Sequence, residues 1–224
     1  MLALAFDTST AAVTVALCEW VSGGAVRMRA MSDTLDRRHA EFLAPSITGV
    51  LAEGGAAARD LDLIVVGAGP GPYTGLRVGL ATAHAMADAL GVLVHGVCSL
   101  DAIAWAAGRP EPFVVASDAR RKEVYWARYD SYQTRFGEPQ VGPPEDAAAA
   151  GLPVVGEGTA LYPAVLGGPQ EPLRPTAVAL AEVAAHALSE GRSLAAAEPL
   201  YLRRPDAREP GARKRVSQPL MADQ

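Results

Sequence analysis

The chain has few cysteines and no long hydrophobic run. Its 224 residues include 2 cysteines, Cys18 and Cys98, which lie far apart and form no CxxC pair. A disulfide framework and a zinc finger are therefore not expected, and a reducing compartment fits. No apolar run reaches the ~20 residues that a membrane-spanning helix needs, and the N-terminus lacks the basic region of a signal peptide. We expect a globular cytoplasmic protein with no membrane contact.

The sequence also lacks a broad basic field. Its formal net charge is -5, with 50% hydrophobic and 20% charged residues. A chain of this charge is not expected to hold RNA strongly by itself. The one dense basic stretch, residues 203–215, lies in a proline-rich C-terminal end, where it is either a solvated tail or an RNA contact.

Several catalytic motifs are missing as well. The histidines His39, His84, His95 and His186 include no pair at the i, i+3 or i, i+4 spacing that forms a metal face on a helix. There is no GxSxG elbow for a serine nucleophile and no Walker A lysine. The residues therefore indicate neither a hydrolase, nor a metalloprotease, nor a P-loop enzyme.

The most informative stretch that is present is GAGPGPYTGLRVG, residues 67–79. It joins a predicted buried strand, Leu61–Val66, to a predicted helix, Thr74–Leu90. Free backbone N–H groups and the helix dipole at such a turn suit an anion, above all a phosphate. The GxGxxG pattern fails, because Pro72 and Thr74 stand where glycine is required. An ordinary strand-to-helix turn also uses glycine and proline, so the loop alone leaves both readings open.

A second polar turn, DTST at residues 7–10, ends the first predicted strand. Its hydroxyls and carboxylate either bond their own backbone or, at the same cleft edge as the glycine loop, form a phosphate cradle. The candidates for a vestigial nucleotide-binding site are Asp7, Ser9, Thr10, Gly69 and Gly71.

Small residues recur every four positions along the helix after the glycine loop. Gly75, Gly79, Ala83 and Ala87 leave a stripe where another backbone can approach closely. The stripe packs either inside the chain, against a predicted helix at Arg37–Glu53, or at a dimer interface.

Periodicity predicts an α/β protein with two lobes. The first, residues 1–109, opens with three antiparallel strands (Leu2–Phe6, Val13–Leu17, Ala25–Met31) and includes the two helices above, a strand at Val92–His95 and a helix at Leu100–Ala107. The second, residues 110–204, is expected to contain strands Phe113–Ser117, Glu123–Tyr129 and Val154–Val155 and helices Pro144–Ala150 and Ala177–Leu188. Residues 205–224 are expected to be a disordered tail.

These residues together resemble the TsaB (YeaZ) family, the non-catalytic partners of the tRNA threonylcarbamoyladenosine synthase TsaD. The resemblance implies the ASKHA fold (actin-like ATPase, ribonuclease H-like) with two lobes, the second reduced. The motifs that carry it cover most of the chain: Phe6–Ser9; Arg37, His39, Leu43 and Pro45; Gly69–Gly71 and Thr74–Gly79; Ser99–Ala102; Asp118–Arg120 with Glu123–Tyr125; and Tyr201–Arg204.

One difference from the catalytic relatives decides the expected role. In TsaD-type paralogues the equivalent of Ser99–Ile103 resembles His-x-x-x-His, two imidazoles that hold the catalytic metal. Here Ser99 and Ile103 occupy those positions. A hydroxyl and a butyl group do not replace two imidazoles, so the resemblance implies the fold without the metal chemistry. The reduced second lobe of the family, which fits the short run between Phe113 and Arg204, puts a complete ATP site in doubt.

The resemblance therefore implies a scaffold with no catalytic residue, metal or required cofactor of its own. It implies a TsaD-like catalytic subunit and a TsaE-like ATPase as partners, with ATP and metal in those subunits, tRNA reached only through the complex, and a homodimer when the chain is alone. The expected interface residues are Arg37, His39, Leu43, Gly75, Leu76, Gly79 and Ala83. Two alternatives are a glycoprotease-type metallopeptidase and a stand-alone ASKHA ATPase.

Overall fold

The first sheet is built around the N-terminal strand. The computed structural model describes residues 1–21 and 24–203. In it, β1 (Leu2–Asp7), β2 (Ala12–Trp20) and β3 (Val26–Leu35) run antiparallel, and β4 (Leu63–Gly67) and β5 (Leu93–Val97) follow parallel to β1. The strand order is β3-β2-β1-β4-β5, so β1 lies in the middle of the sheet.

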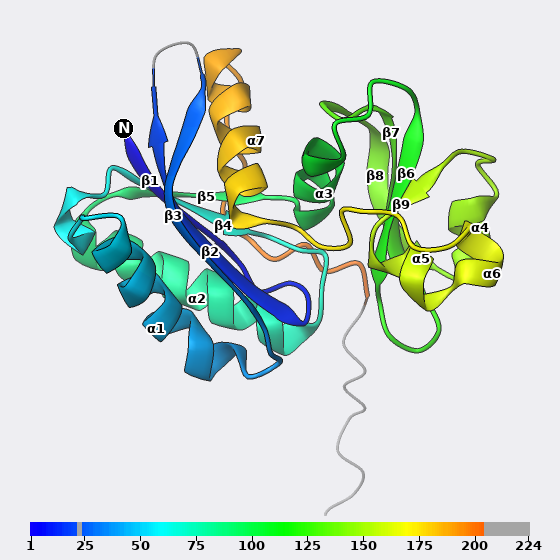
Figure 1. The fold of residues 1–224 in the computed structure, drawn as a ribbon, viewed down its shortest axis with the longest axis horizontal. Coiled ribbons are helices and arrows are strands. Elements are labelled where there is room, and N and C mark those ends of the chain that lie inside the picture. The colour runs from blue at the N-terminus through cyan, green and yellow to red at the C-terminus, as the bar shows by residue number, and fades with distance from the viewer. Residues whose placement is uncertain (22–23, 204–224) are drawn as a thin grey trace, which may run out of the picture.

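Helices cover both faces of this sheet. Helices α1 (His39–Glu53) and α2 (Tyr73–Leu90) pack on one face, and α3 (Ser99–Ala107) and α7 (Ala177–Ser189) lie on the other (Figure 1). The alternation along β1 explains the difference between the faces. Leu4 and Phe6 meet α1 and α2, whereas Ala3 and Ala5 meet the alanine-rich α7. Small side chains on both partners let α7 lie close to the sheet.

The second lobe has a four-stranded sheet. Its strands are β6 (Phe113–Asp118), β7 (Val124–Ser131), β8 (Thr134–Gly142) and β9 (Val154–Val155), in the order β8-β7-β6-β9. Three short helices, α4 (Pro144–Ala148), α5 (Glu157–Leu161) and α6 (Pro163–Leu166), lie in this lobe, and a 3-10 turn spans Ala58–Asp60 in the first. The predicted α/β architecture with two lobes, the second built on the smaller sheet, is confirmed.

Three details of the predicted organisation need correction. Strand β8 was not expected, because Gly137 and Pro139 interrupt its sequence; as an edge strand it tolerates both. Helices α5 and α6 were also not expected. Helix α7 was assigned to the second lobe, but it packs on β1 and β2 of the first. The predicted tail, residues 205–224, lies outside the described residues.

No helix in the described part of the chain is long and apolar enough to cross a membrane.

The small-residue stripe of α2 packs inside the chain. Gly75, Gly79, Ala83 and Ala87 are all buried in the first lobe. A Cβ built on Gly79 would lie 2.4 Å from Thr8 Oγ1, and one on Gly75 would lie 2.4 Å from the Thr8 carbonyl oxygen. The stripe therefore faces the sheet and the turn after β1. Of the two alternatives the internal one holds: the stripe packs mainly on this sheet and turn, and only Gly75, at its start, also lies near His39 of α1.

This contact predicts a large difference between two helical glycines. Gly79→Ala should lower the free energy of unfolding by about 1–3 kcal/mol, because its methyl group overlaps Thr8. Gly49→Ala is the matched control, since a Cβ at Gly49 meets nothing within 4 Å. It should raise stability by roughly 0.5–1 kcal/mol through helix propensity. Urea denaturation followed by circular dichroism measures both, and equal effects would contradict the packing described.

Candidate functional site

The end of β1 carries a buried carboxylate whose two oxygens are both occupied. Asp7 is 1% exposed. Its Oδ1 accepts hydrogen bonds from the backbone N–H of Ser9 (2.6 Å) and from the Ser9 hydroxyl (2.7 Å). Its Oδ2 accepts one from the hydroxyl of Ser99 (2.5 Å), the first residue of α3. The protein itself thus supplies the donors that a buried carboxylate requires.

Ser99 joins the carboxylate to the glycine loop. Its backbone N–H donates to the carbonyl of Gly69 (2.7 Å), and the N–H of Gly69 donates back to the Ser99 hydroxyl (3.2 Å). A Cβ on Gly67 would lie 1.8 Å from Asp7 Oδ2, so only glycine fits at the end of β4. Gly67 is therefore explained by the close approach of its backbone to the Asp7 side chain, with no ligand required.

The polar turn after β1 also forms hydrogen bonds with α1 and α2, the two helices that pack on the same face of the first sheet. The Thr8 hydroxyl donates to the carbonyl of Gly75 (2.8 Å) in the first turn of α2. His39 Nε2, at the start of α1, lies 2.7 Å from the carbonyl of Thr10; because a carbonyl only accepts, this nitrogen is the donor. A Cβ on Gly71 would lie 2.3 Å from the Ser9 carbonyl oxygen.

The structure therefore brings together the five residues predicted to form a nucleotide cradle. Asp7, Ser9, Thr10, Gly69 and Gly71 form one cluster, but its polar side chains bond one another, Ser99 and the backbone. In the sequence, Ser99 was noted only as the residue that replaces a metal-binding histidine. Its role as the hydroxyl that donates a hydrogen bond to Asp7 and accepts one from Gly69 was missed. Its position at the N-terminus of a helix beside a glycine loop was the available signal.

Burial raises the pKa of Asp7 above its ordinary value of 3.8, although the hydrogen bonds from Ser99 and Ser9 oppose the shift. Ionising this group therefore costs more free energy in the folded chain than in the unfolded chain.

The second position of the substituted metal motif is also part of the interior. Ile103, one turn after Ser99 on α3, is 0% exposed and packs among apolar residues of α3, β6 and β7. Among residues 1–21 and 24–203, no group of three or more His, Cys, Asp or Glu side chains is placed to hold a metal ion.

The predicted interface residues divide into surface and interior. Arg37 is exposed and His39 is half-buried. Leu43, Gly75, Leu76, Gly79 and Ala83 are buried within the chain and so present little surface to a partner. Their place in an interface stays a prediction, and the exposed positions of α1 and α2 are the ones that a partner would contact first.

A half-buried ion pair joins the two lobes. Asp101 on α3 accepts two hydrogen bonds from Arg135 Nη1 on β8 (2.8 and 2.9 Å) and one from the Tyr129 hydroxyl on β7 (2.8 Å). Burial opposes the positive charge of Arg135, but the carboxylate of Asp101 raises the pKa of this guanidinium. Arg135 was missed because β8 was not expected.

The C-terminal segment forms a second connection between the lobes. The backbone N–H of Leu200 donates to the carbonyl of Ala68 in the first lobe (2.8 Å). Arg203 donates to the carbonyl of Ala119 (2.9 Å) and pairs with Glu123 in the second lobe.

The turn that Arg203 holds has an unusual backbone. Arg120, Arg121 and Lys122 have φ angles of 61°, 56° and 63°, three consecutive non-glycine residues in the left-handed region. Each such residue costs roughly 1–2 kcal/mol, and strained backbone of this kind persists only where its surroundings hold it. Here Asp118 accepts from the N–H of Arg120 (2.8 Å), and the N–H of Ala119 donates to the carbonyl of Glu123 (3.0 Å).

Comparison with known proteins finds one recurrent similarity. The family model described as "TsaD: tRNA N6-adenosine threonylcarbamoyltransferase" matches residues 33–160. The chain is 30% identical over 221 residues to the tRNA threonylcarbamoyladenosine biosynthesis protein TsaB of Escherichia coli K12, with 89% of this chain and 94% of that protein covered. It is similar to the solved structure of YeaZ from Pseudomonas aeruginosa, with a TM-score of 0.74 and 32% identity over 90% of this chain and 99% of that one.

The chain is also 42% identical, over 92% of its length, to an uncharacterised protein of Mycobacterium leprae, of which it spans 55%. This chain thus covers about half of that relative.

The buried carboxylate predicts a specific pH dependence. Because the folded pKa of Asp7 lies above its ordinary value, the free energy of unfolding should fall as pH rises from 3.8 through the raised pKa. Asp7→Asn keeps the shape and removes this titration, so the variant should gain stability relative to the natural chain as pH rises from about 4 to 7. The gain should be about 1.4 kcal/mol per unit by which the pKa is raised.

Urea denaturation at a series of pH values measures this gain, and the difference between the two proteins cancels the titrations that they share. A difference that stays constant with pH, or that favours the natural chain increasingly as pH rises, would contradict the assignment.

Proposed function

The chain belongs to the TsaB (YeaZ) family, and we propose from this that it is a non-catalytic, partner-binding subunit of the complex that adds threonylcarbamoyl to the adenosine beside the tRNA anticodon. Its Escherichia coli relative is named for tRNA threonylcarbamoyladenosine biosynthesis, and the matching family model is that of the transferase TsaD. Membership of the family thus supports a part in this tRNA modification, and the residues of this chain support a non-catalytic part in it.

The proposal rests mainly on Ser99 and Ile103, which stand where TsaD-type proteins resemble a His-x-x-x-His metal site. Ser99 uses its hydroxyl to bond Asp7 and Gly69, and Ile103 fills the core between the lobes. Both positions contribute to the internal structure of this chain. A protein with this interior keeps the fold of the catalytic relatives without their metal ligands, which suits a subunit that binds a partner.

The exposed faces of α1 and α2 suit a partner. Both helices lie side by side on the outside of the first lobe (Figure 1). Their outward positions include small side chains, among them Ala44 and Thr48 on α1 and Ala81 and Ala85 on α2. Such a surface lets the helices of another protein approach closely, at little cost in side-chain entropy.

We place the partners accordingly. A TsaD-like catalytic subunit uses the α1–α2 face, and a second copy of this chain occupies the same face when that subunit is absent. A TsaE-like ATPase joins the complex; ATP and metal belong to the partner subunits, and tRNA is reached through the assembly in the cytoplasm. This chain needs no cofactor of its own.

Reconstitution tests the role. With the TsaD-like and TsaE-like proteins, tRNA and a threonylcarbamoyl donor present, omission of this chain should lower formation of the modified nucleoside by on the order of tenfold or more. Liquid chromatography with mass spectrometry of digested tRNA measures the product. This chain alone should form none. Modified tRNA formed by this chain in the absence of the TsaD-like protein would show that it is itself an enzyme.

A surface variant tests the interface. Ala85→Arg places a long charged side chain on the exposed face of α2 and should weaken both the homodimer and the complex with the TsaD-like subunit by about tenfold or more. Ala160→Arg, at an exposed position of α5 in the second lobe, is the matched control and should leave both unchanged. Light scattering coupled to size exclusion measures the masses, and circular dichroism confirms folding.

If the TsaD-like protein binds without dissolving the homodimer, the two do not share one surface. If folded Ala85→Arg forms both assemblies normally, the partner face lies elsewhere.

A further inference from the structure

Two opposite charges lie near opposite ends of the exposed side of α2. The helix has one arginine, Arg77, in its second turn and one aspartate, Asp88, in its last turn. Both residues are exposed, and so are Ala81, His84 and Ala85 between them. The helix contains no other arginine, no lysine and no other acid. Its outer side is therefore cationic at one end and acidic at the other.

The two charges lie on one stripe of the helix. They are 11 residues apart in the sequence. Because an α-helix turns by about 100° per residue, this spacing makes about three turns with an offset of roughly 20°. It also separates the two residues by about 16 Å along the helix axis. One neighbouring helix can therefore meet both charges at once.

Neither charge has a counterpart within the described chain. Among residues 1–21 and 24–203, Arg77 and Asp88 form no ion pair. Asp88 also lies in the last turn of α2, where the negative end of the helix dipole disfavours a carboxylate. A cation supplied by another molecule would offset this effect. The position of Asp88 is thus explained better by an assembly than by the isolated helix.

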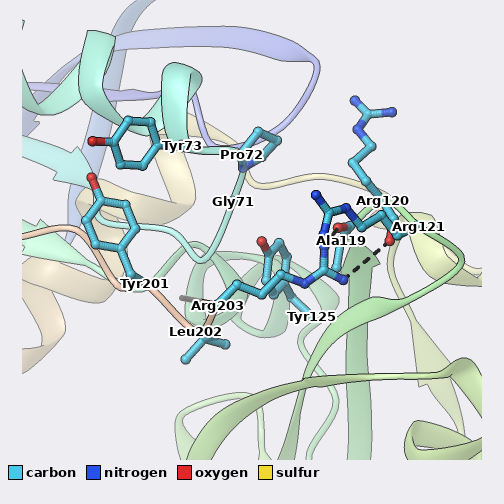
Figure 2. A pocket seen from close by; sticks show the side chains of 10 residues that line it. All are labelled: Gly71, Pro72, Tyr73, Ala119, Arg120, Arg121, Tyr125, Tyr201, Leu202 and Arg203. Atoms are coloured by element: carbon cyan, nitrogen blue, oxygen red, sulfur yellow. Dashed lines mark hydrogen bonds between the residues drawn. The ribbon is translucent and has the colours of Figure 1, made fainter. Parts of the chain in front are cut away.

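Arg77 is held in place by two aromatic side chains. Its guanidinium lies 4.0 Å from the centroid of the Tyr73 ring, and its Nε donates to the Tyr201 hydroxyl (3.4 Å). Figure 2 shows these two rings beside each other at the edge of a pocket, and their centroids are 5.3 Å apart. A side chain that is already held loses less conformational freedom when it pairs with a carboxylate.

The charges of α2 are self-complementary when two copies of the helix run antiparallel. In that arrangement Arg77 of each copy faces Asp88 of the other, whereas a parallel arrangement would bring like charges together. We propose that Arg77 and Asp88 determine how α2 meets a second copy of this chain, in an antiparallel register with two symmetric ion pairs. The inference rests on the proposed use of the α1–α2 face, and it names the residues that decide orientation and partner there.

The register has two further consequences. The two-fold axis passes between residues 82 and 83, so Ala81 faces His84 of the second copy, and a small side chain at that point lets the helices approach closely. His84 Nε2 donates to the carbonyl of Ala197 (2.9 Å), which fixes its ring. A TsaD-like subunit that competes for this face should present a carboxylate to Arg77 and a cation to Asp88.

Sedimentation velocity of the full chain tests the pairing. Asp88→Arg should raise the dissociation constant of the homodimer by about tenfold or more, because two cations then face each other. Glu111→Arg makes the same charge change at an exposed position before β6 and should leave the constant unchanged. The helix dipole favours a cation at the C-terminal end of α2, so weaker association would not reflect a weaker helix. Circular dichroism checks folding.

Charge exchange separates pairing from a structural role. Arg77→Asp should weaken the homodimer as Asp88→Arg does, and the double variant Arg77→Asp/Asp88→Arg should return the dissociation constant to within about threefold of the natural value. An equimolar mixture of the two single variants should form a mixed dimer, which native mass spectrometry detects when one copy is isotopically labelled. Residues that only held α2 in place would show neither form of rescue.

The pairing is wrong if the natural chain stays monomeric, if the folded single variants dimerise normally, or if neither the double variant nor the mixture restores the dimer. The Ala85→Arg assembly assay keeps this failure distinct from failure of the proposed function. Weak assembly of Ala85→Arg without rescue by charge exchange would keep the face and reject the pairing. Normal assembly of Ala85→Arg would reject the face itself.

Discussion

The hydrogen bond between the Ser99 hydroxyl and the buried carboxylate of Asp7 is the contact on which the arrangement of the first lobe depends. It joins the end of the central strand to the start of α3, and the mutual bonds of Ser99 with Gly69 add the glycine loop that leads into α2. A carboxylate at this depth is stable only if donors surround it. The segments that supply those donors are therefore held in one position relative to β1.

This arrangement connects the interior to the proposed role. Residues that resemble a phosphate cradle bond one another, and the position that resembles a metal ligand supplies the hydroxyl that completes the network. The buried glycines of α2 lie directly against Thr8, so that helix is fixed from beneath while its outer side remains exposed. A rigid sheet with two outward helices is the kind of surface that another protein can use without large rearrangement.

The two lobes are connected at more than one place. Arg135 reaches from β8 to Asp101 on α3, and the segment around Arg203 crosses from the glycine loop to the turn after β6. Between these connections, residues that are remote in sequence come together. Tyr73 of α2 stacks on Tyr201, and the left-handed turn at residues 120–122 is held by Asp118 and Arg203. These contacts are thus a property of how the lobes meet.

The amino-acid sequence by itself determined the local elements and the family. The alternation in β1, the periodicity of α2 and the glycine loop predicted the first lobe closely, because these signals depend on near neighbours in the chain. It did not reveal β8, whose glycine and proline are tolerated only at a sheet edge, nor that α7 returns to the first sheet. Only the tertiary structure decided that Gly79 faces Thr8 and not a partner, and that Tyr201 meets Tyr73 across the cleft. Which surface fills a small-residue stripe, and which distant rings stack, follows from long-range packing that no local pattern encodes.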